Sequence, residues 1–234
     1  MTTRELILYL EPTPTSPLRS RVQKFLDDAR ADFYPTTACK YECHCTMTGF
    51  FTVPGEESQV QRVTDTLDRL LHSNSGNRDG ISNSPTIETT PLLVKKPRTF
   101  VTELEGATRI EDYPVHLLLP VSAPSRLHDV VRDFALEYSI VRPKAINHIS
   151  LAYWDEPHAT NDQTLEWHRL VLHERLMDRM YETALNAFKD ISNTADYTEW
   201  DIVLYERTCK GIDVGSRHRF LEHARWSASS FSRS

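Results

Sequence analysis

One order of elements occurs twice along the chain: a strand, a helix, a short strand that begins with histidine, and a second helix. In the first copy, residues 5–11 are apolar and end at a Pro-rich turn, which predicts a buried strand. Ser16 and Pro17 are residue types typical of an N-cap and a first helical position. Residues 44–53 are rich in Thr and aromatic residues, so we expect a second strand there and a helix from Ser58. Such a unit, if repeated, predicts two related halves.

The second copy follows the same order. Residues 115–121 predict a strand, Pro124 opens a helix, and residues 148–154 predict another short strand. A long helix is expected from near Asn161, and residues 198–208 close the pattern as a strand. Three of the predicted helices carry apolar stripes at helical spacing: Leu18, Val22, Phe25, Leu26, Ala29 and Phe33; Val60, Val63, Leu67, Leu70 and Leu71; and Leu127, Val130, Val131, Phe134 and Tyr138.

The order of these elements predicts an α+β fold. We expect a single bilobal domain over residues 1–212, in which strands resume at residues 92–105. Most of residues 73–91 are Ser, Asn, Gly, Pro, Thr or Asp, which predicts a flexible insertion between the two halves of this domain. Residues 213–234 are expected to form a solvated C-terminal tail.

Composition excludes several classes of function. The chain has 27 Lys and Arg against 33 Asp and Glu, a net charge of −6, which disfavours a protein that coats nucleic acid. Its 7 glycines form no phosphate-binding loop. The longest apolar run, residues 6–10, is far shorter than the roughly 20 residues of a spanning helix, so no membrane association is expected. With four cysteines and no visible secretory signal, we expect a reduced intracellular protein, cytoplasmic or nuclear, and a monomer.

Two of the predicted strands begin with the triplet His-x-Thr/Ser, namely His44-Cys45-Thr46 and His148-Ile149-Ser150. Side chains alternate along a strand, so the His and the hydroxyl residue of each triplet share one face, about 6.5–7 Å apart. A third triplet, His158-Ala159-Thr160, follows a proline in a polar segment and lacks apolar alternation, so we set it aside. The bare triplet is common by chance, and the strand context distinguishes the first two.

Across a cleft between two related strands, two imidazoles and two hydroxyls suit a phosphodiester. The hydroxyls can hold the non-bridging oxygens of the phosphate, while the imidazoles flank phosphorus. Hydrolysis needs a neutral imidazole that deprotonates water and a protonated one that protonates the leaving oxygen, and imidazole titrates at about pH 6.5. This chemistry requires neither a metal nor another cofactor.

With these motifs the chain resembles the two-histidine (2H) phosphoesterases, whose signature is a pair of His-x-Thr/Ser motifs on opposed strands. Residues 148–153 (HISLAY) are similar to the second motif of the fungal and plant cyclic nucleotide phosphodiesterases. Residues 199–207 (EWDIVLYER) also resemble the closing strand of that branch, and Tyr9 matches a position where an aromatic residue lines the substrate cleft. Pro commonly precedes each motif in the family, whereas Cys43 and Asn147 stand there in this chain.

The resemblance implies a bilobal fold in which two pseudo-symmetric antiparallel sheets, flanked by helices, enclose a central cleft. The implied reaction is hydrolysis of a 2′,3′-cyclic nucleotide, or of ADP-ribose 1″,2″-cyclic phosphate, to a phosphomonoester. The implied partner is a small nucleotide, with RNA 3′ ends as a further candidate. The implied site consists of His44 and His148 as the catalytic pair, Thr46 and Ser150 as the phosphate-binding hydroxyls, and Tyr153 and Tyr9 on the substrate side.

Two functional alternatives remain open at the level of sequence. One is an RNA-end exonuclease or 2′,5′-phosphodiesterase of the same superfamily, although a longer nucleic acid is expected to need a more basic groove. The other is a nucleotide-binding protein on the same scaffold that does not hydrolyse its ligand. It is disfavoured because both histidines and both hydroxyls are present.

A zinc site is a further alternative, since Cys39, Cys43, His44 and Cys45 are close in sequence. Consecutive residues of a strand point to opposite faces, so Cys43, His44 and Cys45 cannot easily converge on one ion. We therefore expect no metal, and interpret these cysteines as packing or redox-sensitive neighbours of His44.

Overall fold

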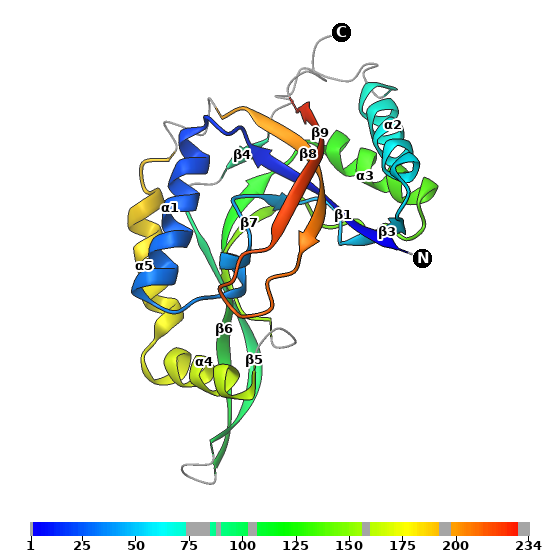
Figure 1. Cartoon of the computed structure of the whole chain (residues 1–234). Coiled ribbons are helices and arrows are strands. Elements are labelled where there is room, and N and C mark those ends of the chain that lie inside the picture. Colours follow the sequence, from blue (N-terminus) through cyan, green and yellow to red (C-terminus); the bar gives the residue numbers. More distant parts are fainter. Residues whose placement is uncertain are drawn as a thin grey trace.

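The computed structural model describes residues 2–73, 85–87, 90–102, 107–155, 160–191 and 198–228. In chain order the elements are β1 (Thr3–Pro12), α1 (Pro17–Asp32), the 3₁₀ helix η1 (Thr37–Lys40), β2 (Cys45–Thr46), β3 (Phe51–Pro54), α2 (Glu57–Ser73), β4 (Thr86–Ile87), β5 (Leu92–Thr102), β6 (Ala107–Ser122), α3 (Ser125–Glu137), β7 (His148–Tyr153), α4 (Asn161–His173), α5 (Leu176–Phe188), β8 (Trp200–Cys209) and β9 (Arg219–Ser227). The expected mixture of helices and antiparallel strands is confirmed (Figure 1).

Within the described residues, the strands form one nine-stranded antiparallel sheet with the path β4-β6-β7-β2-β1-β8-β9. Off this path, β3 pairs with β1 and β5 pairs with β6. The sheet is narrow at its centre, where the two-residue strand β2 meets β7 at the pair Cys45↔Ile149. This pair joins a wing of β1, β3, β8 and β9 to a wing of β4, β5, β6 and β7. The two strands that carry the histidine motifs therefore lie edge to edge.

Alternation along β1 separates a core face from a second face. Leu6, Leu8 and Leu10 are fully buried in the hydrophobic core. The intervening residues Tyr9 and Glu11 point to the opposite face, where they line cavities. The same face continues onto β8, because β1 and β8 pair in register.

The helices lie in two groups on either side of the sheet's centre (Figure 1). One group packs α1 against α5, and the other packs α2 against α3. Helix α1 begins as predicted, because the Ser16 hydroxyl accepts a hydrogen bond from the Leu18 amide at 3.2 Å and Pro17 occupies the first helical position. Helix α4 also packs against α5. Since each group contains helices from both halves of the sequence, the halves interleave in space. No helix in the described ranges is both long and apolar enough to cross a membrane.

A continuous strand over residues 44–53 is wrong: the segment is split into β2 and β3, although both pair with β1. Thr46 pairs with Tyr9 and Phe51 pairs with Leu6. The segment from Thr46 to Phe51 is therefore two residues longer than the part of β1 that it faces, and the extra residues bulge out of the ladder. The amides of Met47 and Thr48 both donate to the carbonyl of Leu8, which accommodates the bulge.

The single long helix expected from Asn161 is also wrong. Thr160 and Gln163 form a capping box that starts α4, but α4 ends at His173 and a new helix, α5, starts at Leu176. Arg175 between them has a φ of 52°, a left-handed backbone conformation that interrupts the helical hydrogen bonds. The apolar spacing continues across the break and therefore concealed it.

The C-terminal segment differs from the expected solvated tail. Residues 219–227 form β9, which pairs along β8 from Asp201↔Ser227 to Cys209↔Arg219. In the expected insertion at 73–91, residues 86–87 form β4 on the edge of β6, and most of the remaining positions lie outside the described residues. His158 and Ala159 of the third triplet, and residues 229–234, also lie outside them.

Candidate functional site

The register between β2 and β7 brings the two histidine motifs together. Cys45 pairs with Ile149, and in an antiparallel ladder this sets Thr46 opposite His148 and His44 opposite Ser150. Cys45 and Ile149 are buried in the core, so the four polar side chains share the other face. The predicted alternation along both triplets is confirmed.

A cavity of about 320 Å³, here called the main cavity, opens on this face. Its lining includes five of the six predicted site residues: Tyr9, His44, Thr46, Ser150 and Tyr153. The sixth, His148, is half-buried at the start of β7 and lies outside this lining, although its charge contributes to lowering the pKa of His44. The structure thus gathers both motif hydroxyls and one imidazole around one cavity, with the other imidazole beside it.

Tyr153 reaches the cavity through an irregularity in β7. In a regular strand, Tyr153 would share the core face with Ile149 and Leu151. The register with β6 shifts between Leu117 and Leu118, and beyond the shift Tyr153 pairs with His116. Tyr153 therefore lines the main cavity together with Tyr41. Burial raises the pKa of Tyr153, so its hydroxyl stays protonated.

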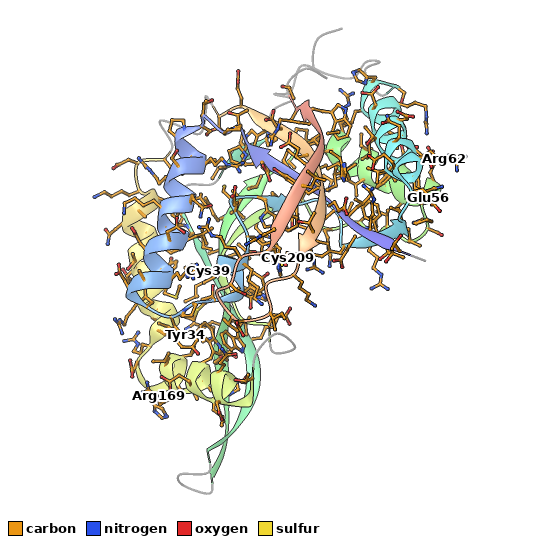
Figure 2. All side chains as sticks on the ribbon, viewed as in Figure 1. Tyr34, Cys39, Glu56, Arg62, Arg169 and Cys209 are labelled. Carbon is orange, nitrogen blue, oxygen red and sulfur yellow. The ribbon has the colours of Figure 1, made fainter. Side chains whose placement is uncertain are left out.

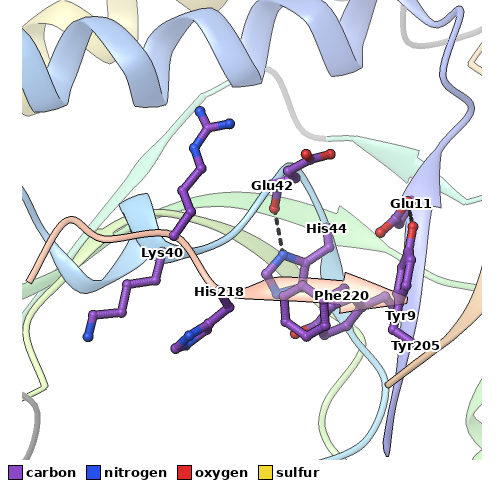
Figure 3. A pocket seen from close by; sticks show the side chains of 9 residues that line it. Tyr9, Glu11, Lys40, Glu42, His44, Tyr205, His218 and Phe220 are labelled. Carbon is purple, nitrogen blue, oxygen red and sulfur yellow. Dashed lines mark hydrogen bonds between the residues drawn. The ribbon is translucent and has the colours of Figure 1, made fainter. Parts of the chain in front are cut away.

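His44 is held in one tautomer. Its Nδ1 lies 2.7 Å from the backbone carbonyl oxygen of Glu42 (Figure 3). A carbonyl can only accept, so Nδ1 carries the proton, and the lone pair of the neutral ring is on Nε2. The ring packs against Tyr9, with centroids 4.0 Å apart, and against Tyr41 at 5.3 Å. Burial lowers the pKa of His44 to about 4, with smaller contributions from the charges of His148 and Arg19.

His148 has a more open environment. Its Nδ1 lies 2.7 Å from the side-chain oxygen of Asn147, an exposed residue. With the amide in this orientation, Nδ1 donates and Nε2 again carries the lone pair of the neutral ring. Partial burial lowers the pKa of His148 below 6.5.

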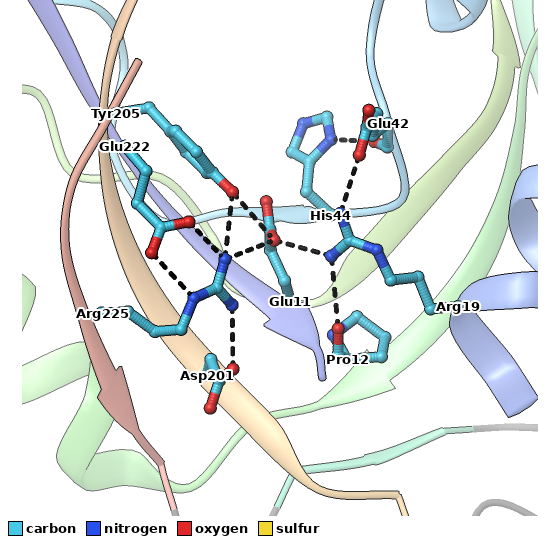
Figure 4. Close-up of polar contacts among 9 residues, drawn as sticks. All are labelled: Glu11, Pro12, Arg19, Glu42, His44, Asp201, Tyr205, Glu222 and Arg225. Atoms are coloured by element: carbon cyan, nitrogen blue, oxygen red, sulfur yellow. Dashed lines mark hydrogen bonds and ion pairs between the residues drawn. The ribbon is translucent and has the colours of Figure 1, made fainter. Parts of the chain in front are cut away.

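A network of ion pairs around the buried carboxylate of Glu11 supports the backbone that holds His44 (Figure 4). Arg19, on α1, donates to the Glu11 carboxylate at 2.7 Å and to the Glu42 carboxylate at 2.7 Å. It also donates to the carbonyl of Pro12 at 3.3 Å. Arg19 thereby ties the loop before β2 to the end of β1, and its second partner, Glu42, is the residue whose carbonyl orients His44.

Glu11 is the centre of this network. It is 2% exposed, and it accepts a hydrogen bond from Tyr205 at 3.3 Å in addition to that from Arg19. A second guanidinium, that of Arg225 on β9, lies 4.0 Å away and is itself paired with Asp201 at 2.8 Å. Burial outweighs these favourable contacts and raises the pKa of Glu11 above its usual value.

Sequence reasoning missed several residues of the site. Tyr41 and Lys144 line the main cavity, and His116 lies on the same face beside Tyr153. Lys144 is brought there because its amide donates to the Met47 carbonyl, which attaches the segment before β7 to the bulge. No local motif marks these positions; only the pairing of distant strands does.

The cysteines near His44 face away from it. Cys43 and Cys45 are fully buried, and burial raises the pKa of Cys45 to about 12. Cys39 is also buried, whereas Cys209, at the end of β8, is exposed. Figure 2 labels both residues. In the described part of the chain, no group of three or more His, Cys, Asp or Glu side chains could hold a metal ion. Cys39, Cys43 and Cys45 are buried among the core residues.

Comparison with known proteins identifies no relative: no family model matches the chain, and no curated protein matches it. What the protein does is therefore inferred from the side chains around the main cavity.

Proposed function

We propose that the protein is a metal-independent cyclic phosphodiesterase of the two-histidine type. Its substrate would be a 2′,3′-cyclic nucleotide or ADP-ribose 1″,2″-cyclic phosphate, and its product a phosphomonoester. The observation that carries this proposal is the main cavity itself, which combines the His44 imidazole with the hydroxyls of Thr46 and Ser150. The division of the sheet into two wings at Cys45↔Ile149, with one motif on each side, supports the bilobal arrangement that the resemblance implies.

In the proposed reaction, Thr46 and Ser150 donate hydrogen bonds to the non-bridging oxygens of the cyclic phosphate. His44 Nε2 takes a proton from water as the water oxygen forms a bond to phosphorus. The bond from phosphorus to one ribose oxygen breaks, and His148 Nε2 gives its proton to that oxygen. One water is consumed, and a second proton exchange with solvent restores the two imidazoles.

The assignment of His44 as base and His148 as acid follows from their environments. With a pKa of about 4, His44 is neutral over most of the pH range and has its lone pair on Nε2. The pKa of His148 is lowered by partial burial alone, and an anionic phosphate beside it would favour the protonated form. Each proton transfer of this kind contributes typically 10²–10⁴-fold to the rate.

The proposal includes a monomeric protein that acts on a small nucleotide in a reducing compartment, the cytoplasm or the nucleus. Four free cysteines support the reducing compartment. The size of the main cavity, about 320 Å³, supports a small ligand, because pockets for such ligands span about 300–1,000 Å³.

Turnover of 2′,3′-cyclic nucleotides in excess EDTA tests the proposal. We expect hydrolysis to persist in EDTA and to fall by at least 100-fold in both His44→Ala and His148→Ala. His128→Ala, at an exposed histidine on α3, is the matched control and should retain full activity. Loss of turnover in EDTA, or activity that survives both site substitutions, would contradict the mechanism. Tight nucleotide binding without turnover would indicate the non-hydrolytic binding protein instead.

A further inference from the structure

A second cavity of about 160 Å³, here called the side cavity, lies beside His44 (Figure 3). The side cavity and the main cavity share Tyr9, Glu42 and His44, so a ligand whose phosphate lies at the motif hydroxyls can extend from one cavity into the other. The side cavity reaches from there towards β8, β9 and their connection. The proposed reaction leaves it unused.

The walls of the side cavity are aromatic. Phe220, half-buried on β9, has its ring centroid 5.7 Å from that of Tyr205 and 6.0 Å from that of Tyr9. These rings offer flat apolar surfaces on which a planar heterocycle can stack. A sugar or an aliphatic chain would gain less from them.

Two polar groups in these walls are buried and incompletely used. The Glu11 side chain is 3% exposed, and both of its described hydrogen bonds, from Arg19 and Tyr205, reach Oε2. The hydroxyl of Tyr9 is buried and has no hydrogen-bond partner among the described residues. A buried polar atom without a partner is costly, so the Tyr9 hydroxyl, in a residue that lines both cavities, points to a ligand that supplies the missing partner. Glu11 Oε1 is in addition an acceptor that none of the described hydrogen bonds uses.

The floor of the side cavity is rigid. Lys40 is 1% exposed, and its ammonium group donates to the carbonyls of Gly211 at 3.0 Å and Ile212 at 3.2 Å. The amide of Gly211 donates in turn to Nδ1 of His218 at 2.9 Å. These contacts fix the β8–β9 connection against η1, so that the cavity is largely formed before a ligand arrives.

We propose that the side cavity binds the nucleobase of the substrate and that Glu11 selects bases carrying an exocyclic amino group. A carboxylate only accepts hydrogen bonds, so it attracts an amino group and repels a carbonyl oxygen at the same position. Cytosine and uracil are the sharpest pair, because they share one ring skeleton and differ at C4, where cytosine has an amino group and uracil a carbonyl, and at the adjacent N3, which is an acceptor in cytosine and a donor in uracil. The inference places the C4 substituent, and not N3, against Glu11. The position of the phosphate rests on the proposed function, whereas binding of the base does not require catalysis.

Binding of the nucleosides cytidine and uridine, which lack phosphate, tests this inference directly. We expect isothermal titration to give a dissociation constant roughly tenfold lower for cytidine than for uridine, as for a charge-assisted hydrogen bond. The same ratio is expected in kcat/KM for the two 2′,3′-cyclic nucleotides. Equal binding of the two nucleosides, or binding of neither at millimolar concentrations, would overturn the inference.

Two variants separate the carboxylate from the stacking surface. Glu11→Gln keeps the shape but can both donate and accept, so the cytidine-to-uridine ratio should fall to near one. Phe220→Leu should weaken the binding of both nucleosides to a similar extent and leave the cytidine-to-uridine ratio unchanged. Leu221→Ala, at a 49% exposed neighbour on β9, is the control and should change neither. Because Phe220→Leu lies outside the Arg19 network, it remains informative if Glu11→Gln unfolds.

The outcomes distinguish this inference from the proposed function. Discrimination between the nucleosides without hydrolysis of any 2′,3′-cyclic nucleotide or of ADP-ribose 1″,2″-cyclic phosphate would contradict the phosphodiesterase and leave the base site standing. Hydrolysis of the cytidine and uridine substrates at equal rates, with equal binding of the two nucleosides, would support the phosphodiesterase and contradict the base site. A ratio in Glu11→Gln that equals the wild-type ratio, in a variant with wild-type circular dichroism, would also overturn the role of Glu11.

Discussion

His44 and His148 open two strands of similar sequence pattern, but the protein surrounds them differently. His44 lies between two tyrosine rings, and its Nδ1 donates to a backbone carbonyl. His148 is half-buried, and its Nδ1 contacts the side chain of Asn147, which is exposed. A peptide carbonyl fixed in a strand-end loop holds a ring more rigidly than a side-chain amide that can rotate.

The difference extends to the surrounding charges. Behind the Glu42 carbonyl lies the network of Arg19, Glu11 and Arg225 (Figure 4), whereas no described ion pair includes Asn147 or His148. The His44 imidazole is thus held in place, and its pKa is strongly lowered. The His148 imidazole can reorient, and its pKa is lowered by partial burial alone. This asymmetry is what the proposed roles of His44 as general base and His148 as general acid require.

The largest effect should come from removing each imidazole in turn and comparing pH profiles. His44→Gln and His148→Gln should each reduce kcat/KM for a 2′,3′-cyclic nucleotide by 10²–10⁴-fold. In the wild type, activity should rise through the pKa of His44, about 4, and fall above a pKa of His148 that lies below 6.5. His44→Gln should lose the rising limb and His148→Gln the falling limb. Loss of the opposite limbs would reverse the two roles.

A second comparison concerns stability rather than rate. An unfolded histidine titrates near pH 6.5, and His44 in the fold near 4, so between these values the unfolded state binds a proton that the folded state does not. The free energy of unfolding should therefore fall as pH drops from 6.5 to 4, by up to about 3 kcal/mol from His44.

Urea unfolding of the wild type, His44→Gln and His148→Gln at pH 7 and pH 4.5 measures this contribution. The loss between the two pH values should be smaller in His44→Gln than in the wild type, and His148→Gln should lie between them. Carboxylates that titrate in the same range affect all three proteins alike. Equal losses in the two variants would mean that the two imidazoles do not differ in burial, and losses identical in all three proteins would mean that neither imidazole contributes.

A smaller effect is expected from Arg19, which acts on His44 through Glu42. Arg19→Gln removes a positive charge that lowers the pKa of His44 and releases the Glu42 side chain. The rising limb of the pH profile should move to higher pH, and kcat/KM should fall roughly tenfold, because the ring is held less firmly. NMR titration of the imidazole protons would follow both histidines separately.

Arg69→Gln is the matched control, since Arg69 pairs with Glu137 on the exposed surface between α2 and α3. It should change neither limb. An Arg19→Gln protein whose His44 pKa and rising limb are unchanged would restrict Arg19 to a structural role.

Much of this asymmetry could not be read from the sequence. The capped start of α1, the apolar stripes and the alternation within each triplet were predictable, because each depends on residues close together in the chain. The bulge between Thr46 and Phe51 and the shift that turns Tyr153 into the cavity depend on strand register, which distant residues determine. β9 was missed for the same reason, since its polar sequence becomes a strand only by pairing with β8.

The smallest expected effect concerns Asn147, the counterpart of the Glu42 carbonyl. Asn147→Ala removes one hydrogen bond to His148, worth about 0.5–1.5 kcal/mol, so kcat/KM should fall by roughly 2–10-fold. Asn147→Asp instead places a carboxylate at Nδ1, which favours the imidazolium and should move the falling limb to higher pH. The rising limb, which belongs to His44, should stay in place in both variants.

The stability of the protein should not change in either Asn147 variant. Because Asn147 is exposed, the free energy of unfolding measured with urea at pH 7 should differ from that of the wild type by no more than a few tenths of a kcal/mol. A fall in kcat/KM as large as that of His148→Gln would show that His148 is as tightly held as His44, and the contrast between the two motifs would then be lost.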